Sequence, residues 1–381
     1  MLIGLDAIPL TIPRAGVGHY TFELARALAL AAPGDEFELA YPSSHPPLDL
    51  GESDVLPPNL REARVRVGAL GRRWWSAGLP RYAGRRGLSL FHGTNYDVPL
   101  WGVAARVLTV HDLSQFVHPE THERRGVRRA RRRLPLMARA AEAVVTPTEA
   151  VRREVCEHLG VPGAKVFAVH EAARACFRPL ARPEAEESLR DLGVGGDFLL
   201  AVGTIEPRKN LATLVRAFED VLRERPDAPL RLVVAGGRGW LSGPLFEALE
   251  RSPARGRVTL TGYVSDAQLR ALYSACRAFV YPSFYEGFGL PPLEAMSCGA
   301  PVLTGNLTSL PEVVGDAGLT VDPFDTGALG QALARLIDDA ALRAELRERG
   351  LRRARGFDWR DTARMTLQVY RRVEGRMKAE R

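Results

Sequence analysis

Short apolar runs alternate with helix-length amphipathic segments along the whole chain. The runs are rich in Val, Leu and Ala and barely alternate between apolar and polar residues, as expected for parallel strands covered on both faces. Helix-length segments between strands indicate β–α–β crossovers. In the first half, strands are predicted at Leu2–Ala7, Glu36–Tyr41, Arg64–Gly68, Leu88–His92, Arg106–His111, Ala143–Thr146 and Val166–His170. In the second half, they are predicted at Phe198–Gly203, Arg231–Ala235, Arg257–Thr261, Ala278–Pro282, Pro301–Thr304 and Leu319–Val321.

The strand–helix series stops and restarts between Phe177 and Asp197, in a stretch that holds two Arg-Pro steps and a run of glycines. A chain of 381 residues is expected to form more than one core, because single cores stop growing at roughly 250–300 residues. We therefore predict an α/β protein with two Rossmann-like doubly wound domains facing a cleft, at 1–180 and 195–356. The segment 357–381 is predicted to be a terminal helix. Ligands of such sheets bind at the carboxyl ends of the strands.

Composition is that of an ordinary globular protein, with 46% hydrophobic and 25% charged residues. The N-terminus resembles a first strand and not a signal peptide, so a cytoplasmic protein is predicted. The cysteines are scattered without C-x-x-C spacing, and we predict no metal site. The net charge is +7, and one short stretch, Arg124–Arg133, is rich in arginine. Such a stretch is either a solvated helix face or a contact for an anionic partner.

The strongest local signal is the glycine-rich segment after the predicted strand Ala278–Pro282. Gly287 and Gly289 allow the backbone to approach a ligand closely, and the following helix N-terminus suits an anion such as a diphosphate. Glu286 and Glu294 are eight positions apart and can both accept hydrogen bonds from one hydroxyl-rich ligand. A plain structural turn is the alternative interpretation.

A second signal lies at the end of the first strand of the C-terminal half. Arg208 and Lys209 are adjacent there and suit a diphosphate whose negative charge grows as it leaves. An ion pair with Glu206 is the alternative.

Two further candidates lie in the N-terminal half. His111 and Asp112 follow a predicted strand, where active-site residues gather, although a lone histidine is more often part of a core. Gly16 and Gly18 follow the first strand and open a helix, as in a short phosphate or acceptor loop.

Together these motifs resemble glycosyltransferase family 4, a family of retaining enzymes of GT-B fold, over nearly the whole chain. The segment Glu286 to Glu294 is similar to the E-x7-E signature of that family. Four other segments resemble its mannosyltransferase-like branch, namely Gly203–Asn210, Ser309–Val313, Gly315–Gly318 and Phe357–Trp359.

The resemblance implies a role for each motif residue. Glu286 would hold hydroxyls of the donor sugar, and Glu294 the ribose of the nucleotide. Arg208 and Lys209 would stabilise the leaving diphosphate. The same donor site would include Gly203, Thr204, Gly287, Phe288, Gly289 and Leu290.

For the N-terminal half, the resemblance places His111 beside the transferring sugar, as a fourth catalytic residue with Glu286, Arg208 and Lys209. Gly16, Gly18 and Asp112 would belong to an acceptor or phosphate loop of this N-terminal acceptor domain. The terminal helix at 357–381 would cross back to the same domain, and 195–356 would be the donor domain. His19 stands where relatives carry Arg, so this loop does not identify the acceptor.

The implied activity is transfer of a hexose, mannose from GDP-mannose, to a saccharide or lipid-linked acceptor with retention of configuration. The nucleotide sugar is a co-substrate and no cofactor is expected. The sequence contains no Asp-x-Asp, which is consistent with a site where Arg and Lys replace a metal ion.

Three other interpretations remain open. A sugar-nucleotide epimerase would use the same donor cleft but needs acid and base carboxylates, for which Asp112 is the nearest candidate. A basic nucleic-acid-binding protein is disfavoured, because Arg124–Arg133 has no interleaved aromatic residues. The third hypothesis adds to the enzyme a peripheral contact of this segment, with Leu134, Leu136 and Met137, to the anionic inner face of a membrane.

Overall fold

The computed structural model describes residues 1–13, 16–50, 55–68 and 73–379, and the chain groups into two units. The first unit comprises Met1–Val117, Arg124–Glu171 and Asp358–Arg381, and the second comprises His118–Glu123 and Ala172–Phe357. The boundary predicted after residue 180 therefore lies too late in the chain, because Ala172 already groups with the second unit.

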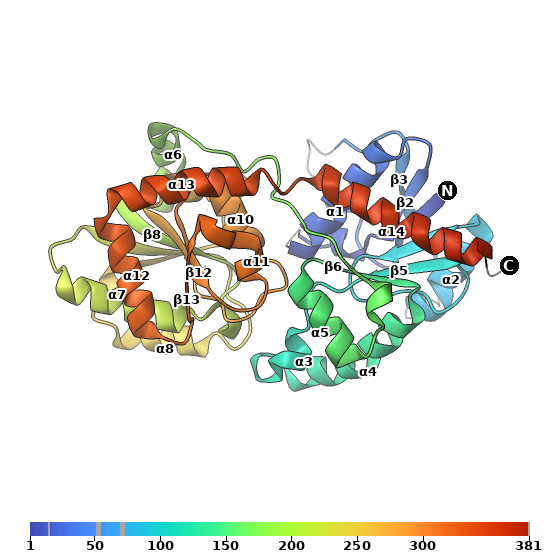
Figure 1. Ribbon diagram of the computed structural model, residues 1–381, viewed down its shortest axis with the longest axis horizontal. Coiled ribbons are helices and arrows are strands. Elements are labelled where there is room, and N and C mark those ends of the chain that lie inside the picture. The colour runs from blue at the N-terminus through green and yellow to red at the C-terminus, as the bar shows by residue number, and fades with distance from the viewer. Residues whose placement is uncertain (14–15, 51–54, 69–72, 380–381) are drawn as a thin grey trace. The chain divides into compact units, whose positions relative to one another are not determined.

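The first unit contains a sheet of seven parallel strands in the order β3-β2-β1-β4-β5-β6-β7 (Figure 1). The strands are β1 (Leu2–Asp6), β2 (Glu36–Pro42), β3 (Leu60–Val65), β4 (Leu90–Gly93), β5 (Ala105–Thr109), β6 (Ala143–Thr146) and β7 (Val166–Ala168). The helices are α1 (Gly16–Ala31), α2 (Leu79–Arg86), α3 (Ser114–Val117), α4 (Arg124–Ala140), α5 (Glu149–Leu159) and α14 (Trp359–Ala379).

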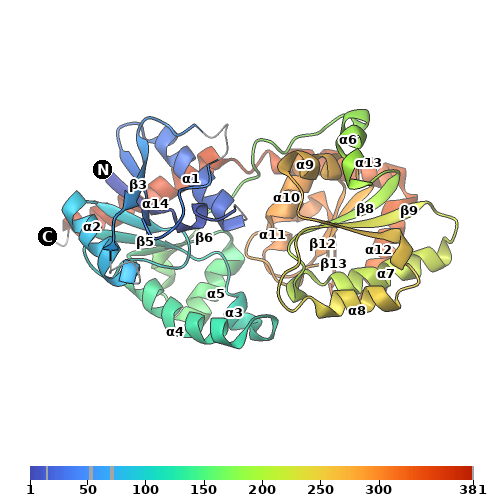
Figure 2. The ribbon, with the colours of Figure 1, turned by 180° about the vertical axis from the view of Figure 1, so that it is seen from behind.

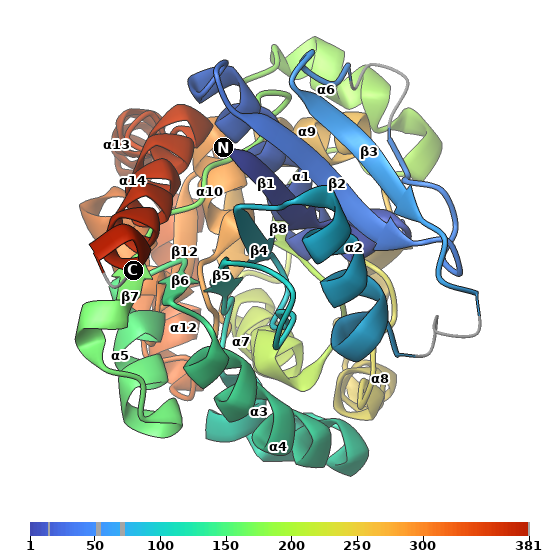
Figure 3. The same ribbon diagram turned by 90° about the vertical axis from the view of Figure 1, so that its right-hand side faces the viewer.

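Successive residues of these strands supply two different cores. Val107 of β5 packs with α1 and α14 on one face of the sheet, whereas its neighbour Leu108 packs with α4 and α5 on the other. This alternation follows from the two-residue period of a strand. Figure 3 shows α14 and α5 on opposite sides of β6.

The second unit has a six-stranded parallel sheet in the order β10-β9-β8-β11-β12-β13 (Figure 2). The strands are β8 (Asp197–Val202), β9 (Leu230–Ala235), β10 (Val258–Gly262), β11 (Ala278–Tyr281), β12 (Val302–Gly305) and β13 (Leu319–Val321). Its helices are α6 (Arg182–Ser188), α7 (Leu211–Glu224), α8 (Gly243–Arg251), α9 (Asp266–Ala275), α10 (Leu290–Ser297), α11 (Leu310–Val314), α12 (Thr326–Asp338) and α13 (Ala340–Ala354).

Both units are α/β folds with a doubly wound sheet, as predicted. Each sheet reverses its strand order at one point. The reversal lies between β1 and β4 in the first unit and between β8 and β11 in the second. Loops that leave the carboxyl ends of strands on either side of such a reversal diverge and leave a crevice for ligands. The loops after β8 and β11 are those that carry the strongest motifs.

The third strand was predicted at Arg64–Gly68, and this placement is wrong. β3 covers Leu60–Val65 and pairs with β2 from Phe37↔Leu60 to Pro42↔Val65. It is an edge strand with mostly exposed side chains, so its pairing with β2, and not an apolar run, fixes its position.

The apolar residues that follow the arginine-rich stretch do not lie together on the surface. Leu134 and Met137 of α4 are buried against β5 and β6, and only Leu136 is exposed. The proposal that all three join the arginines at a membrane is therefore wrong. The exposed face of α4 is basic, with seven exposed arginines: Arg124, Arg125, Arg128, Arg129, Arg131, Arg132 and Arg139.

Candidate active site

Two glycines bring the loops after β8 and β9 into close contact. A Cβ atom added to Gly236 would lie 2.0 Å from the carbonyl oxygen of Gly203, and the two residues have φ values of 147° and 136°. Only glycine adopts this conformation without strain. The contact holds Gly203 at the end of β8, beside the exposed Thr204.

Lys209 and Glu286 form a buried ion pair between the loops after β8 and β11. The Lys209 Nζ donates to Glu286 Oε1 and to the Tyr281 hydroxyl, at 2.6 Å each. The Ser283 hydroxyl lies 2.6 Å from the same Glu286 oxygen. Burial opposes ionisation of Glu286, but the charges of Lys209 and Arg208 outweigh it and lower the pKa of this carboxyl. Glu286 is therefore held as a carboxylate acceptor.

Arg208 contacts the same loop but pairs with a different carboxylate. Its Nη2 donates to Glu206 Oε1 at 2.6 Å, and its Nη1 donates to the carbonyl of Tyr285 at 3.3 Å. The sequence alternative, an ion pair with Glu206, is thus observed for Arg208. Burial raises the pKa of Glu206, against the effect of Arg208 and Lys209. Both cations therefore contact the segment that contains Glu286.

The turn into α10 combines a left-handed glycine with two prolines. Gly289 caps the helix at φ 110°, and the Ser309 hydroxyl lies within 2.9 Å of the carbonyls of Glu286 and Phe288. Of the first three helix residues, only Leu290 has an N–H, because the next two are prolines. An anion at this turn would therefore depend more on Arg208 and Lys209 than on the helix N-terminus.

Glu294 lies in a different set of contacts from Glu286. The Tyr273 hydroxyl donates to Glu294 Oε2 at 3.3 Å, and Arg174 Nη2 lies 3.7 Å from Glu294 Oε1. Burial raises the pKa of Glu294 to about 7, although Arg174 opposes the shift. The two glutamates of the E-x7-E segment are thus both buried acceptors with separate partners.

In the first unit, His111 is fixed by both ring nitrogens. Nε2 lies 2.8 Å from the carbonyl oxygen of Thr94, and Nδ1 lies 3.4 Å from Glu171 Oε1. The Tyr20 ring packs against it edge-on. Such an imidazole cannot rotate freely, which suits a residue that orients a substrate.

The other predicted residues of this unit lie near its β1 and β5 strands. The Asp112 carboxylate accepts hydrogen bonds from Ser114 N and Oγ and so starts α3. Gly16 and Gly18 lie in the first turn of α1, and a Cβ atom added to Gly16 would meet nothing within 4 Å. Arg14, next to this loop, is outside the described residues.

Sequence reasoning missed several residues that hold the site. Ser283 and Tyr281 lie inside the motif segment, so their place beside Lys209 could have been suspected. Glu171 and Arg174 lie in the segment between the halves, where no motif marks them.

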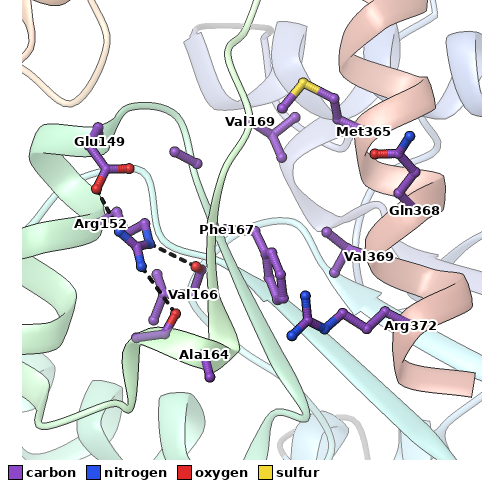
Figure 4. A pocket seen from close by; sticks show the side chains of 12 residues that line it. Glu149, Arg152, Ala164, Val166, Phe167, Val169, Met365, Gln368, Val369 and Arg372 are labelled. Atoms are coloured by element: carbon purple, nitrogen blue, oxygen red, sulfur yellow. Dashed lines mark hydrogen bonds and ion pairs between the residues drawn. The ribbon is translucent and has the colours of Figure 1, made fainter. Parts of the chain in front are cut away.

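A separate cavity of about 490 Å³ lies in the first unit between α5, β7 and α14. In Figure 4 the Arg372 side chain reaches toward the Phe167 ring, and its guanidinium carbon stands 5.2 Å from the ring centroid. None of the predicted site residues lines this cavity.

The chain thus combines two parallel doubly wound sheets with glutamates and cations at the strand reversal of the second, an arrangement found in two-domain α/β enzymes. Residues 186–353 match the glycosyl transferases group 1, and residues 14–172 match Glycosyltransferase Family 4. The chain belongs to glycosyltransferase family 4 and is a glycosyltransferase of GT-B fold.

A full-length relative is the O-antigen chain mannosyltransferase B of Escherichia coli. It is 34% identical, over 95% of this chain and 97% of its own. The sucrose-phosphate synthase of Thermosynechococcus elongatus has the same fold, with a TM-score of 0.75 at 22% identity, over 97% of this chain and 98% of its own. Anabaena HepE, solved with UDP and glucose, gives a TM-score of 0.73 at 17% identity over the same shares.

Among the described residues, no helix combines the length and hydropathy that a membrane crossing requires. No group of three or more His, Cys, Asp or Glu residues in the described ranges could hold a metal ion.

Proposed function

We propose that the protein transfers mannose from GDP-mannose to a saccharide or lipid-linked acceptor, with retention of configuration and without a metal ion. The observation that best supports this function is the Lys209–Glu286 ion pair at the strand reversal of the second unit. The choice of mannose is supported by the full-length relative that is named a mannosyltransferase.

The chemistry follows from the charges at this point. The bond between the anomeric carbon and the donor phosphate oxygen breaks, and its electron pair stays on the departing nucleoside diphosphate. Arg208 and Lys209 stabilise that charge as it develops. The acceptor hydroxyl bonds to the same face of the anomeric carbon, and its proton passes to a donor phosphate oxygen. Glu286 holds the sugar through its hydroxyls, and His111 orients the ring.

Calorimetric titration with GDP, UDP and ADP tests the donor site. We expect GDP to bind, with the same affinity in EDTA, and the binding to be lost in Glu294→Ala. Glu250→Ala, an exposed glutamate of the same unit, is the matched control and should bind normally. Binding of no nucleotide by the folded protein would contradict the proposal.

The competing assignments give different results in the same experiments. A UDP-hexose donor, as the UDP and glucose bound to HepE would suggest, predicts tighter binding of UDP than of GDP. An epimerase predicts a changed sugar nucleotide in the absence of any acceptor. Nothing in the comparisons favours the epimerase.

We also propose that the exposed face of α4 contacts an anionic membrane surface. Within the described part of the chain, four exposed arginines of α4 have no carboxylate oxygen within 4.0 Å: Arg124, Arg125, Arg128 and Arg132. Each Lys or Arg near an anionic surface contributes about 1 kcal/mol of attraction. Because Leu134 and Met137 are buried, this contact would be electrostatic and sensitive to salt.

Sedimentation with phosphatidylglycerol vesicles tests this contact. Replacing the four arginines by glutamine should abolish binding, whereas phosphatidylcholine vesicles should not bind at all. The control replaces four exposed arginines of the second unit, Arg216, Arg223, Arg251 and Arg255. Binding that survives in the α4 variant would refute the membrane proposal.

A further inference from the structure

Arg174 lies just after the point where the chain enters the second unit, and its guanidinium reaches Glu294. Its Nη2 is 3.7 Å from Glu294 Oε1, and both side chains are nearly buried, with 11% and 9% of their surface exposed. No sequence motif marks Arg174.

The guanidinium is held in place by groups other than Glu294. Its Nη1 and Nη2 donate to the two carboxylate oxygens of Asp266 at 2.5 and 3.0 Å, and it stands 4.8 Å from the centroid of the Phe177 ring. A bidentate pair of this kind fixes the plane of the arginine. The contacts with Asp266 and Phe177 therefore direct the Arg174 guanidinium at Glu294.

We propose that Arg174 is a positioning residue for the donor nucleotide: it keeps Glu294 ionised and oriented as the acceptor for hydroxyl groups of the nucleoside diphosphate. This inference rests on the proposed function, in which Glu294 binds the ribose. It adds a residue of the entering segment to a site otherwise built from β8, β11 and α10.

The charges around Glu294 explain why such a residue is needed. Asp266 and Glu294 share one guanidinium, and the half-exposed Asp266 is the closer partner. Burial raises the pKa of Glu294 to about 7. Arg174 and the Tyr273 hydroxyl oppose this shift, whereas the charge of Asp266 adds to it. Burial raises the pKa of the Cys176 and Cys298 thiols, and the charge of Glu294 adds to both shifts.

The pH dependence of nucleotide binding then follows. An ionised carboxylate accepts hydrogen bonds from two hydroxyls, whereas a protonated one loses an acceptor site. Affinity should rise with pH as Glu294 loses its proton. Without Arg174 the burial of Glu294 is uncompensated, so its pKa increases and the rise in affinity moves to higher pH.

Calorimetric titration with GDP and UDP between pH 5.5 and pH 9 tests the inference on the full chain. Arg174→Gln should bind the nucleotide about tenfold more weakly at pH 6 and recover most of the loss at pH 9. Arg174→Lys should keep much of the wild-type profile, because it retains the charge. Glu294→Gln should bind weakly with no rise across this range, and adding Arg174→Gln to it should cause little further loss.

Arg270→Gln is the matched control. Arg270 is an α9 arginine that donates to the carbonyls of Arg178 and Pro179, in the same segment, without contacting Glu294. It should leave the pH profile unchanged, and circular dichroism establishes that each variant is folded.

The outcomes distinguish a failure of the proposed function from a failure of the role of Arg174. Failure of the wild-type protein to bind either nucleotide would contradict the proposed function itself. Nucleotide binding that depends on Glu294, with an unchanged pH profile in folded Arg174→Gln, would overturn only the role of Arg174. A uniform loss at every pH, with no rescue by Arg174→Lys, would also overturn it, because that result indicates a merely structural arginine.

Discussion

At the scale of single residues, the site depends on buried charges that compensate one another. Lys209 is the direct partner of Glu286, and Tyr281 and Ser283 complete the contacts of the pair. Removing one member of a buried ion pair leaves the other charge without compensation, which costs more than the pair contributed. In the proposed function, the pair therefore couples the binding of the donor sugar to the stabilisation of the diphosphate.

Lys209→Met should lower the turnover number by about 10²–10³-fold, the usual effect of removing one group that stabilises transition-state charge. Its acid limit of activity should move to higher pH, because Lys209 helps to lower the pKa of Glu286. Steady-state kinetics across pH measures both effects. Lys165→Met, in the first unit, serves as the control. An unchanged turnover number in folded Lys209→Met would rule out the catalytic role.

Asp6, at the end of β1, gives a separate prediction about stability. Burial raises its pKa to about 8, and Asp97 adds to the shift while the Ile8 N–H opposes it. An unfolded aspartate has a pKa of about 4. Between these values the folded state keeps a proton that the unfolded state releases, so stability falls as pH rises.

Asp6→Asn removes this penalty and can still accept the hydrogen bond from Ile8 N. Its stability relative to wild type should increase from pH 5 to pH 8, by at most about 1.4 kcal/mol per pH unit. Urea denaturation at the two pH values measures the difference. The exposed Asp227→Asn should show no such trend, and a parallel shift of both variants would contradict the account.

At the scale of elements, α14 completes the core of the first unit. Ala363, Leu367 and Tyr370 are buried against α1 and the sheet (Figure 1). The Tyr370 hydroxyl lies 2.6 Å from Nδ1 of His92 on β4. Burial lowers the pKa of His92 to about 3, so this histidine is neutral and has one donor and one acceptor nitrogen.

Two substitutions separate the hydrogen bond from the packing of this helix. Tyr370→Phe should destabilise the first unit by about 1–3 kcal/mol, because it leaves a buried His92 nitrogen without a partner. Tyr370→Ala should cost about 3–5 kcal/mol, since it also opens a cavity. Hydrogen exchange of the β4 amides reports both. Equal effects of the two variants would show that packing contributes little.

Most elements could be predicted from the sequence, because central parallel strands are apolar on both faces and stand out as Val, Leu and Ala runs. β3 could not be placed, since an edge strand is defined by its pairing and not by its composition. The inward orientation of Leu134 and Met137 was also missed, because the arginines around them suggested an exposed segment.

The candidate site was predictable where contacts join two motifs. Lys209 and Glu286 each carried a signal, and the parallel sheet brings their loops together. Arg174 could not be found in this way. Its link to Asp266 and Glu294 depends on how the entering segment packs against α9 and α10, which no local pattern encodes.

At the scale of the whole molecule, the chain crosses from one unit to the other both before and after the candidate donor segment. It enters the second unit at Ala172 and leaves it after Phe357. The entering segment contacts Glu294 through Arg174, and Phe357, the last residue of the second unit, packs its ring 5.8 Å from Phe288 in the glycine-rich loop. Both ends of the second unit therefore contact the segment from Phe288 to Glu294, which we propose binds the donor.

Phe357→Ala should weaken GDP binding several-fold, because Phe288 loses its edge-on aromatic partner, a contact worth about 0.5–1.5 kcal/mol beyond burial. Phe357→Leu, which keeps most of the volume, should retain more of the affinity. Titration calorimetry compares the two. Unchanged affinity in Phe357→Ala would show that this contact does not support the loop.

The most direct test of the central claim is to follow GDP-mannose by proton NMR with oligomannoside acceptors in the presence of EDTA. We expect consumption of the donor, release of GDP and a new α-linked mannose, since the donor is itself an α-anomer, and product formation about 10²–10³-fold slower in Lys209→Met. A β-linked product would contradict retention. Turnover that requires an added metal ion, or no transfer from GDP-mannose while a UDP-hexose is consumed, would contradict the assignment of the donor site.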